Sequence, residues 1–249
     1  KVTIFESSEH LGGILYDIIP DYRLPKEDLQ KSIDKIIDLG PEVKTGMTLG
    51  KNLSFTDLEK FDSVFLGIGA WKGRKIDENR DDLADVVLGL DILKHIRKGE
   101  KDKVGKNVMI VGGGNTAIDV ARSVLRIGSK PIILYRRDMD QMPAFSQEIK
   151  EATREGIEIK NNVIIKEIIR SEDSIVGVKC VKVKYDKDDR NKFEEIEDSE
   201  FFLETDQVIS AIGESPDTSV IENEIDIKWG KVTVDRFGRT TNPKYFAGG

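Results

Sequence analysis

The chain has 249 residues, of which 38% are hydrophobic and 34% are charged, so it is long enough to bury one large core or two ordinary ones. Its 39 basic and 46 acidic side chains give a net charge of −7, which argues against nucleic acid or an anionic membrane as the main partner. The longest apolar runs, such as residues 132–135, have the length of a strand and cannot span a bilayer. Nothing resembles a signal peptide. We therefore expect neither a nucleic-acid partner nor a membrane partner.

The rarest reactive side chains exclude several kinds of site. Cys180 is the only cysteine, so the chain by itself cannot form a disulfide, a redox-active cysteine pair or a four-thiolate iron–sulfur site. His10 and His95 are the only histidines and lie far apart, which favours two surface imidazoles over a metal site or a catalytic triad. We expect no metal site, and a cytoplasmic location.

Short apolar runs alternate with helical patterns along the first hundred residues, which predicts an α/β protein with parallel strands. Strands are expected at residues 2–5 and 63–70, and helices after Pro25 and at residues 91–98. The helix after Pro25 is expected to carry Leu29, Ile33, Ile36 and Ile37 on one apolar face and to end at Gly40.

The second half of the chain continues the same alternation. Strands are expected at residues 108–111 and 132–135, on either side of a glycine turn and a helix that ends at Gly128. We expect residues 186–199, where acidic and basic side chains are mixed, to be a solvated hairpin tip rather than an ion site. The remaining predicted elements are a proline-initiated helix at 142–156 and strands at 176–185, 200–203, 207–212 and 232–234.

The glycine turn is the clearest motif in the sequence. Its residues fit the pattern GxGxxA between a strand and a helix, in which glycine permits a tight turn and lets the backbone approach a pyrophosphate at the helix N-terminus. The flanking strand, the helix and a second strand at the right distance favour dinucleotide binding over a turn that is merely tight. The motif consists of Gly112, Gly113, Gly114, Asn115, Thr116 and Ala117.

The second strand of this unit ends in Arg136 and Arg137. An NAD-binding unit usually carries an acid there, which accepts hydrogen bonds from the ribose hydroxyl groups. Guanidinium groups instead pair with a 2′-phosphate, so the residue types indicate NADP rather than NAD. The alternative is that the arginines only solvate the end of a strand.

The first strand of the chain ends in an acid, Glu6. A carboxylate at this position suits a nucleotide with a free ribose, and FAD is such a nucleotide. The alternative is an ordinary solvent-exposed acid at a strand end. Taken together, the two strand ends predict two nucleotide sites of opposite charge in one chain.

Several motifs together resemble one family of proteins. They are VTIFE, LGGIL, IPDYRLPKEDL, VFLGIGA, VMIVGGGNTAIDVARSVLRIG, ILYRRDMDQMPA, VISAIGESPD and FAGG, in this order over nearly the whole chain. The chain resembles the small subunit of NADPH-dependent glutamate synthase and its relatives in dihydropyrimidine dehydrogenase and in bifurcating ferredoxin:NADP oxidoreductases. The resemblance implies two Rossmann-like domains, an NADPH domain at 86–212 inserted into an FAD domain at 1–85 and 213–249.

The resemblance also implies roles for individual residues. Residues 112–117 would hold the pyrophosphate of NADPH, and Arg136 and Arg137 its 2′-phosphate, whereas Glu6 would hold the adenosine ribose of FAD. Because the cofactors supply the chemistry of hydride transfer, we expect no catalytic side chain. Further expected cofactor-binding positions are Gly12, Gly13, Leu49, Gly69, Ala70, Ala211, Gly213, Gly248 and Gly249, with Tyr22 and Arg23 near the flavin.

The function implied by the resemblance is hydride transfer from NADPH to FAD, with electrons passing on to an iron–sulfur domain or to a partner subunit. The alternative is a catalytically silent module that binds NADP(H) and serves sensing or assembly. Steady oxidation of NADPH by an artificial acceptor, with FAD supplied, separates the two.

The sequence departs from the family pattern in three places. In the family pattern, the glycine loop of the FAD site and a cysteine-rich segment would come before Lys1, and an acid would come directly after Gly249. The sequence contains none of these three features. The loop at 75–82 lacks the usual proline-glycine turn between domains. We therefore expect a fragment whose FAD site is incomplete, which binds NADP(H) but retains flavin weakly or not at all.

Overall fold

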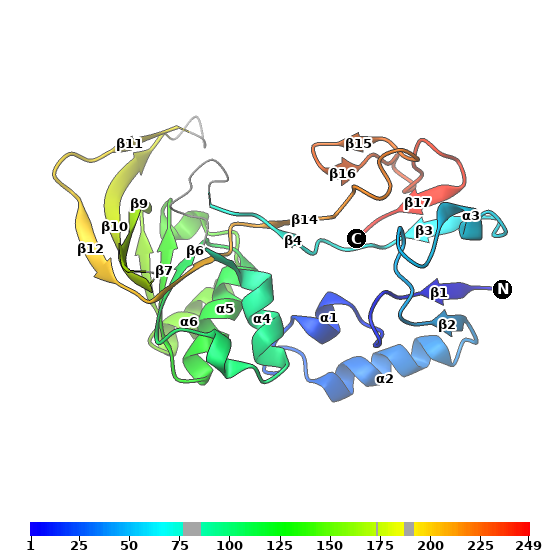
Figure 1. Ribbon diagram of the computed structural model, residues 1–249, viewed down its shortest axis with the longest axis horizontal. Coiled ribbons are helices and arrows are strands. Elements are labelled where there is room, and N and C mark those ends of the chain that lie inside the picture. Colours follow the sequence, from blue (N-terminus) through cyan, green and yellow to red (C-terminus); the bar gives the residue numbers. More distant parts are fainter. Residues whose placement is uncertain (77–85, 173, 187–191) are drawn as a thin grey trace. The chain divides into compact units, whose positions relative to one another are not determined.

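The computed structural model describes residues 1–76, 86–172, 174–186 and 192–249. Contacts within the chain divide it into two compact units (Figure 1). Unit 1 consists of Lys1–Lys72 and Glu214–Gly249, and unit 2 of Gly73–Gly213. Both contain helices and strands, which confirms the α/β class. Within the described residues, no helix is both long enough and apolar enough to cross a bilayer.

Unit 2 is built on a five-stranded sheet whose neighbouring strands are parallel. In sheet order the strands are β5 (Val87–Leu88), β13 (Gln207–Ser210), β6 (Asn107–Val111), β7 (Lys130–Tyr135) and β8 (Glu158–Asn161). Its connecting helices are α4 (Gly89–Arg97), α5 (Asn115–Arg126) and α6 (Ser146–Arg154). Because neighbouring strands of this sheet are parallel throughout, the carboxyl ends of the strands meet at one edge of the sheet.

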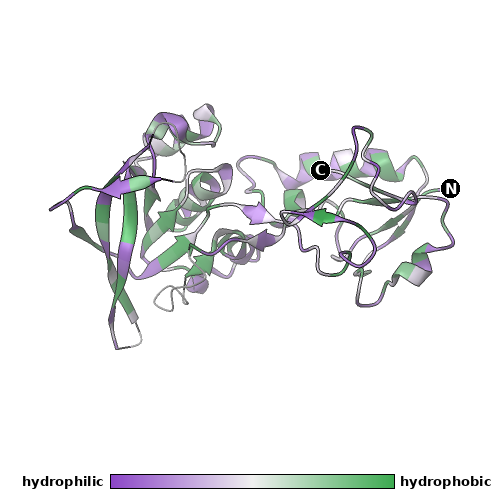
Figure 2. Ribbon diagram, turned by 90° about the horizontal axis from the view of Figure 1, so that it is seen from above, coloured by the Kyte–Doolittle hydropathy of each residue, from purple (hydrophilic) through white to green (hydrophobic). Residues whose placement is uncertain are grey.

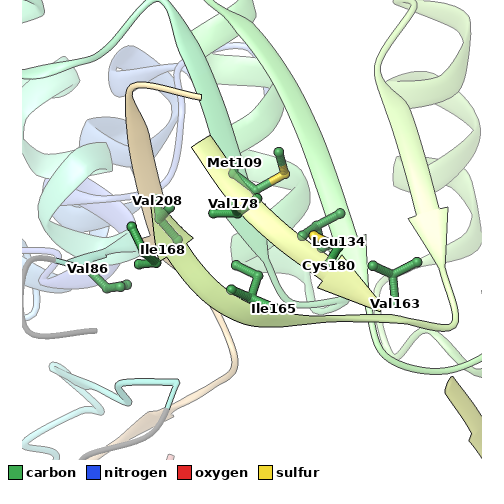
Figure 3. Packing of buried hydrophobic residues seen from close by; sticks show 9 residues of the cluster. All are labelled: Val86, Met109, Leu134, Val163, Ile165, Ile168, Val178, Cys180 and Val208. Atoms are coloured by element: carbon green, nitrogen blue, oxygen red, sulfur yellow. The ribbon is translucent and has the colours of Figure 1, made fainter. Parts of the chain in front are cut away.

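An antiparallel sheet covers one face of the parallel sheet. Met109, Leu134 and Val208 of the parallel strands pack against Val178 and Cys180 in one hydrophobic cluster (Figure 3). The side chains of successive strand residues alternate between faces, so Ile110 and Ile133, which are fully buried, point to the opposite face. The antiparallel strands are β9 (Val163–Ser171), β10 (Ser174–Tyr185), β11 (Phe193–Glu195) and β12 (Phe201–Glu204). In Figure 2 the strands of unit 2 carry long hydrophobic stretches, as two packed layers require.

Four elements of unit 2 differ from the sequence-based expectation. Helix α6 begins at Ser146 rather than at Pro143, because the N–H groups of Ala144 and Phe145 donate to another segment, described below, instead of joining a helix. Strands β8 and β9 were not predicted. The hairpin at 186–199 contains strand β11, and residues 187–191 lie outside the described part.

Unit 1 contains shorter strands. Strand β1 pairs in parallel with β2, and β3 with β17. The strand bounds are β1 (Thr3–Phe5), β2 (Glu42–Lys44), β3 (Val64–Leu66), β15 (Ile227–Lys228), β16 (Lys231–Val232) and β17 (Tyr245–Ala247). The helices are α1 (Ile14–Asp17), α2 (Lys26–Ile37) and α3 (Phe55–Leu58). The core of this unit is a cluster of Leu53, Leu58, Leu66, Ile221, Ile225, Tyr245 and Ala247.

Helix α2 buries only part of its predicted apolar face. Leu29 and Ile33 are buried, whereas Ile36 and Ile37 are 51% and 41% exposed, so only half of the predicted face is covered. The reason is that α2 packs against the segment that begins at Gly12, where an added Cβ atom would lie 3.3 Å from the ends of the Leu29 and Ile33 side chains. The last turn of α2 extends beyond this contact.

The chain passes between the units twice. The two passages form a short sheet of their own, in which β4 (Lys72–Gly73) pairs with β14 (Glu214–Ser215). Most of the segment 75–82, which lacks the family's proline-glycine turn, lies outside the described residues.

Candidate functional site

Three of the predicted site residues follow directly after neighbouring strands of the parallel sheet. Gly112 follows β6, Arg136 follows β7 and Ala211 follows β13. Since β6 pairs in parallel with both β7 and β13, these residues lie at one edge of the sheet, the carboxyl edge. In open parallel sheets this edge is where ligands bind.

Gly112 and Gly113 are required by the packing of the protein itself. A Cβ atom on Gly112 would lie 2.1 Å from the carbonyl oxygen of Ala211, and the residue has φ 147°. A Cβ atom on Gly113 would lie 2.4 Å from the ring of Tyr135. The N–H of Gly112 also donates to the carbonyl of Leu134, at 3.0 Å. These two glycines therefore let the turn pass tightly between the ends of three strands.

Gly114 differs from them because a Cβ atom there would meet nothing within 4 Å. It occupies the N-cap of α5 with φ −85°, a conformation that any residue can adopt. The first turn of α5 has neither a side-chain cap nor an acidic residue. Its N–H groups, with the positive end of the helix dipole, are therefore available to an anion, and the missing side chain leaves room for it.

The other motif residues support the turn. Ala117 is fully buried, which is the role of the third small residue in this motif, where the helix packs on the sheet. The methyl group of Thr116 lies 3.3 Å from the position of a Cβ on Gly89, so it packs against the first residue of α4. The side chain of Asn115 accepts a hydrogen bond from the N–H of Phe145, at 2.9 Å.

The segment before α6 is a part of the site that sequence reasoning missed. The N–H of Ala144 donates to the carbonyl of Gly113, at 3.1 Å, and the N–H of Phe145 to Asn115. These two bonds hold the segment against the glycine turn, which is why α6 starts later than predicted. The sequence signal was the stretch MPA after the arginines, which is part of the family motif but does not by itself indicate a contact.

Arg136 is exposed and Arg137 is half-buried. Their guanidinium carbons lie 5.8 and 5.6 Å from the centre of the same ring, that of Tyr185 at the end of β10. The carbonyl of Arg137 accepts a hydrogen bond from the N–H of Asn162, at 3.2 Å. The structure therefore brings two cationic groups together at the edge that also carries the glycine turn.

Helix α5, whose first turn is uncapped, is held by charged groups on its other half. Arg122 has an 8% exposed side chain and bonds to Glu155 and Glu148 of the segment containing α6. Arg126 bonds to Glu155 as well. Hydrogen bonds from Arg126 and Arg122 lower the pKa of Glu155 from 4.5 to about 2, because both favour the charged carboxylate. This network fixes α5 against α6.

The predicted acid of unit 1 lies in a local turn. The carboxylate of Glu6 accepts hydrogen bonds from the N–H of Ser8, at 2.8 Å, and from the hydroxyl of Ser7, at 3.2 Å. Both bonds reach the same oxygen, Oε1, so they orient the carboxylate at the end of β1. Gly12 and Gly13, with φ 113° and 53°, form the next turn and lead into α1.

The remaining positions of unit 1 lie in three places. Gly69 and Ala70 follow β3, and Gly248 and Gly249 follow β17, so these four residues lie beyond the carboxyl ends of two paired parallel strands. Leu49, in contrast, packs against the hydrophobic core of the unit. Tyr22 and Arg23 lie in the turn before α2, where the N–H of Arg23 donates to the carbonyl of Pro20 at 2.9 Å.

The predicted residues are thus divided between the units. Glu6, Gly12, Gly13, Leu49, Gly69, Ala70, Gly248 and Gly249 lie in unit 1, and the glycine motif, the two arginines, Ala211 and Gly213 in unit 2. Gly213 has φ 125°, and its carbonyl accepts a hydrogen bond from the N–H of Arg74 at 3.0 Å. In chemical terms, the edge of unit 2 suits a ligand with two anionic groups, one at the helix end and one at the arginines.

Comparison with known proteins gives relatives along nearly the whole chain. The beta subunit of NADPH-Fe(3+) oxidoreductase from Geobacter sulfurreducens (strain DL-1 / KN400) is 36% identical over 244 residues, which cover 92% of this chain and 36% of that protein. The small chain of NADPH glutamate synthase from Escherichia coli (strain K12) is 31% identical over 273 residues, which cover 100% of this chain and 58% of that protein. The beta subunit of NADP(+)-dependent formate dehydrogenase from Moorella thermoacetica is 33% identical over 259 residues, which cover 100% of this chain and 37% of that protein. The chain therefore spans from about a third to three fifths of the length of these relatives, and the resemblance found in the motifs is confirmed.

Solved structures support the fold. FprA from Mycobacterium tuberculosis in complex with NADPH has a TM-score of 0.80 at 14% identity, with 100% of this chain and 71% of that chain covered. Thioredoxin reductase from T. acidophilum has a TM-score of 0.69 at 17% identity, with 100% and 81% covered. The predicted Rossmann-like fold is thereby confirmed. A family model described as pyridine nucleotide-disulphide oxidoreductase matches residues 22–249. The chain belongs to the pyridine nucleotide-disulphide oxidoreductase family.

Proposed function

We propose that the chain is the nucleotide-binding part of an NADPH-dependent flavoprotein oxidoreductase similar to the glutamate synthase small chain. In this proposal unit 2 binds NADPH and unit 1 contributes to an FAD site. The observation that carries it is the combination, at one sheet edge, of an open glycine at a helix N-terminus and two arginines after the neighbouring strand.

The residues of unit 2 fit a pyrophosphate and a 2′-phosphate. Gly114 leaves open the space that a side chain would occupy, and the uncapped first turn of α5 offers N–H groups to the pyrophosphate. Arg136 and Arg137 follow β7, where a carboxylate would otherwise meet the ribose. Their guanidinium groups would pair with the 2′-phosphate, which distinguishes NADPH from NADH.

The residues of unit 1 fit a second nucleotide of the other kind. The Glu6 carboxylate, oriented through Oε1 by Ser8 and Ser7, would accept hydrogen bonds from the ribose hydroxyl groups of FAD. The turns at Gly12, Gly13, Gly69 and Ala70, together with Gly248 and Gly249, would let backbone approach the rest of that ligand. In this division, 1–85 and 213–249 would be the FAD domain and 86–212 the NADPH domain.

When bound, NADPH supplies a hydride and FAD the group that accepts it. The part of this chain is to bind and orient the two nucleotides, and no side chain is assigned an acid or base role. Cys180 is completely buried, so it does not act as a redox partner. A single cysteine also cannot hold an iron–sulfur cluster, so electrons would leave for an iron–sulfur domain or a partner subunit. The names of two relatives as beta subunits support such a partner.

The test is to titrate the protein with NADPH and with NADH and to measure binding by the fluorescence of the nucleotide. The double variant Arg136→Ala, Arg137→Ala is expected to weaken NADPH binding roughly 10- to 100-fold, because two charge-assisted hydrogen bonds are lost, and to leave NADH binding within about twofold. Gly114→Ala is expected to weaken the binding of NADPH and of NADH by similar factors of about ten or more, because the new methyl group would occupy the space of the pyrophosphate.

The matched control is Arg154→Ala. Arg154 is also an arginine of unit 2, but it has a 71% exposed side chain and pairs with Glu151 of its own helix. It is expected to leave both affinities unchanged. Unchanged NADPH affinity and unchanged preference over NADH in the Arg136, Arg137 double variant contradict the assignment of the arginines.

A further inference from the structure

The two arginines share one aromatic neighbour that lies far from them in the sequence. The ring of Tyr185 is 5.8 Å from the guanidinium carbon of Arg136 and 5.6 Å from that of Arg137. Both distances are within the range in which a cation is attracted to the electron-rich face of a ring. We propose that Tyr185, supported by Phe193, positions the two guanidinium groups for the 2′-phosphate of NADP(H). This inference rests on the proposed function and adds a determinant of specificity to it.

The like charges of the arginine pair explain why a support is needed. Two adjacent guanidinium groups repel each other, and long side chains at a strand end are mobile unless something orders them. An aromatic ring attracts both cations without removing their hydrogen-bond donors, because the attraction comes from the ring quadrupole. A carboxylate in its place would occupy the donors that the phosphate needs and would repel the phosphate itself.

The ring of Tyr185 is itself held in place. Tyr185 pairs with Phe193 in the antiparallel register of β10 and β11, and the two ring centres are 5.4 Å apart at 34°. The next residue, Asp186, donates from its N–H to the carbonyl of Lys192, at 3.0 Å. The aromatic pair therefore forms a fixed surface where β10 and β11 pair. Phe193 belongs to the segment 186–199, for which the sequence predicted only a solvated hairpin tip.

The backbone of the arginines is fixed to the same hairpin. Asn162 has φ 57° and lies between β8 and β9. Its N–H donates to the carbonyl of Arg137, its side chain donates to Asp138 at 2.6 Å, and its carbonyl accepts from the N–H of Val183 at 2.8 Å. Val183 is two residues before Tyr185 on β10. One residue thus holds the arginine segment and the tyrosine strand at a set distance.

The ring, and not the hydroxyl, is the part of Tyr185 that acts. The hydroxyl oxygen is buried and has no hydrogen-bond partner among the residues that the structure describes. Removing it is therefore expected to cost nothing in binding, whereas removing the ring takes away the surface on which both guanidinium groups rest. This difference makes Tyr185→Phe and Tyr185→Leu an informative pair.

The test compares adenosine 2′,5′-bisphosphate with 5′-AMP, which differ only in the 2′-phosphate, by calorimetric titration. Tyr185→Leu is expected to bind the bisphosphate about 5- to 10-fold more weakly and 5′-AMP within twofold of the unaltered chain. Tyr185→Phe is expected to match the unaltered chain for both ligands, and Phe193→Leu to lie between. Phe202→Leu is the control, since Phe202 lies on β12 of the same sheet and packs over Gly177 instead.

A double-mutant cycle separates positioning from general damage to the fold. If Tyr185 acts through the arginines, Tyr185→Leu changes the affinity for the bisphosphate by less than twofold in the Arg136→Ala, Arg137→Ala background. An undiminished effect there, or equal losses for 5′-AMP and the bisphosphate, overturns the proposal. The proposal is also overturned if Tyr185→Leu binds the bisphosphate as tightly as the unaltered chain while the arginine double variant binds it weakly. That result leaves the proposed function standing. If the unaltered chain does not prefer the bisphosphate to 5′-AMP, the arginine assignment and this inference both fail.

Discussion

The glycine turns of the two units differ in what fixes their backbone. In unit 2, a Cβ atom on Gly112 would meet the main chain of Ala211, which the paired strands hold rigidly. In unit 1, a Cβ atom on Gly12 would lie 3.1 Å from Cβ of Tyr16 and 3.3 Å from the ends of two aliphatic side chains. The main chain of Ala211 directly follows β13 and its N–H donates to the carbonyl of Val111 at 2.8 Å, so it yields less readily than side-chain ends, which can shift by a few tenths of an ångström. The turn of unit 2 is therefore the more demanding of the two, and substitutions at the two turns measure the difference.

The molecule carries separate probes for its two units. Both tryptophans, Trp71 and Trp229, lie in unit 1, and the only cysteine, Cys180, lies in unit 2. Tryptophan fluorescence and thiol labelling during urea unfolding therefore report on different units of the same sample.

The largest effect is expected for Gly112→Ala. The new methyl group would lie 2.1 Å from a backbone oxygen, and φ 147° is strained for any residue with a side chain. We expect the free energy of unfolding of unit 2 to fall by about 3–4 kcal/mol, measured by thiol labelling in urea. Gly114→Ala is the matched control, because its methyl group meets nothing and its φ is ordinary. Equal stability of the two variants would refute the packing account of the turn.

A smaller effect is expected for Glu155→Gln, which tests how each unit holds its helix. Gln removes the charge that pairs with the nearly buried Arg122, so the free energy of unfolding is expected to fall by about 2 kcal/mol at pH 7. The counterpart in unit 1 is Asp28→Asn on α2, since the Lys31–Asp28 pair has side chains that are 70% and 60% exposed. No measurable change is expected there.

The same carboxylate predicts a pH dependence. The pKa of Glu155 is lowered from 4.5 to about 2 in the folded chain, so its stabilising contribution is complete above pH 4.5 and is lost as the pH falls towards 2. The stability difference between the unaltered chain and Glu155→Gln should therefore shrink over this range. A difference that stays constant from pH 5 to pH 2.5, measured by urea unfolding, contradicts the ion-pair account.

A still smaller effect is expected for Gly12→Ala in unit 1. The φ of 113° is unfavourable for alanine, but the neighbouring side chains of Leu29 and Ile33 can yield. We expect a loss of about 1–2 kcal/mol in the free energy of unfolding of unit 1, followed by tryptophan fluorescence. A loss as large as that of Gly112→Ala would show that the two turns are equally rigid.

Sequence reasoning reached the glycine turn because all its signals are local. A strand, three glycines and a helix start follow one another within residues 108–117, and each obeys its own backbone rule. The contacts of Asn115 with Phe145 and of Arg137 with Asn162 join segments 25 to 30 residues apart. Nothing in the local pattern specifies such pairs, so this part of the site became visible only in the structure.

Strand β9 shows a second reason why prediction fails. Its buried residues are Val163, Ile165 and Ile168, so the alternation of two breaks after Ile165. At that point Ile165 pairs with Cys180 but Glu167 pairs with Lys179, which leaves Lys166 as the extra residue of a β-bulge. A spacing of two followed by three fits a helix as well as a strand. The bulge that curves the hairpin thus also hides the strand from a periodicity argument.

The smallest effect is expected for the Cys180 thiol, which should not react with a labelling reagent in the folded chain. The thiol is fully buried in the cluster between the two sheets of unit 2, and burial raises its pKa to about 12 (Figure 3). Since only the thiolate reacts, we expect no labelling by a disulfide reagent at pH 8 until unit 2 opens, and complete labelling in urea. The labelling rate should rise in Gly112→Ala, where unit 2 is destabilised, and stay unchanged in Gly12→Ala, where the strain lies in unit 1. If both substitutions raise the labelling rate of Cys180 equally, the two units unfold together as one cooperative fold. The two glycine turns could then not be assigned separate effects on separate units.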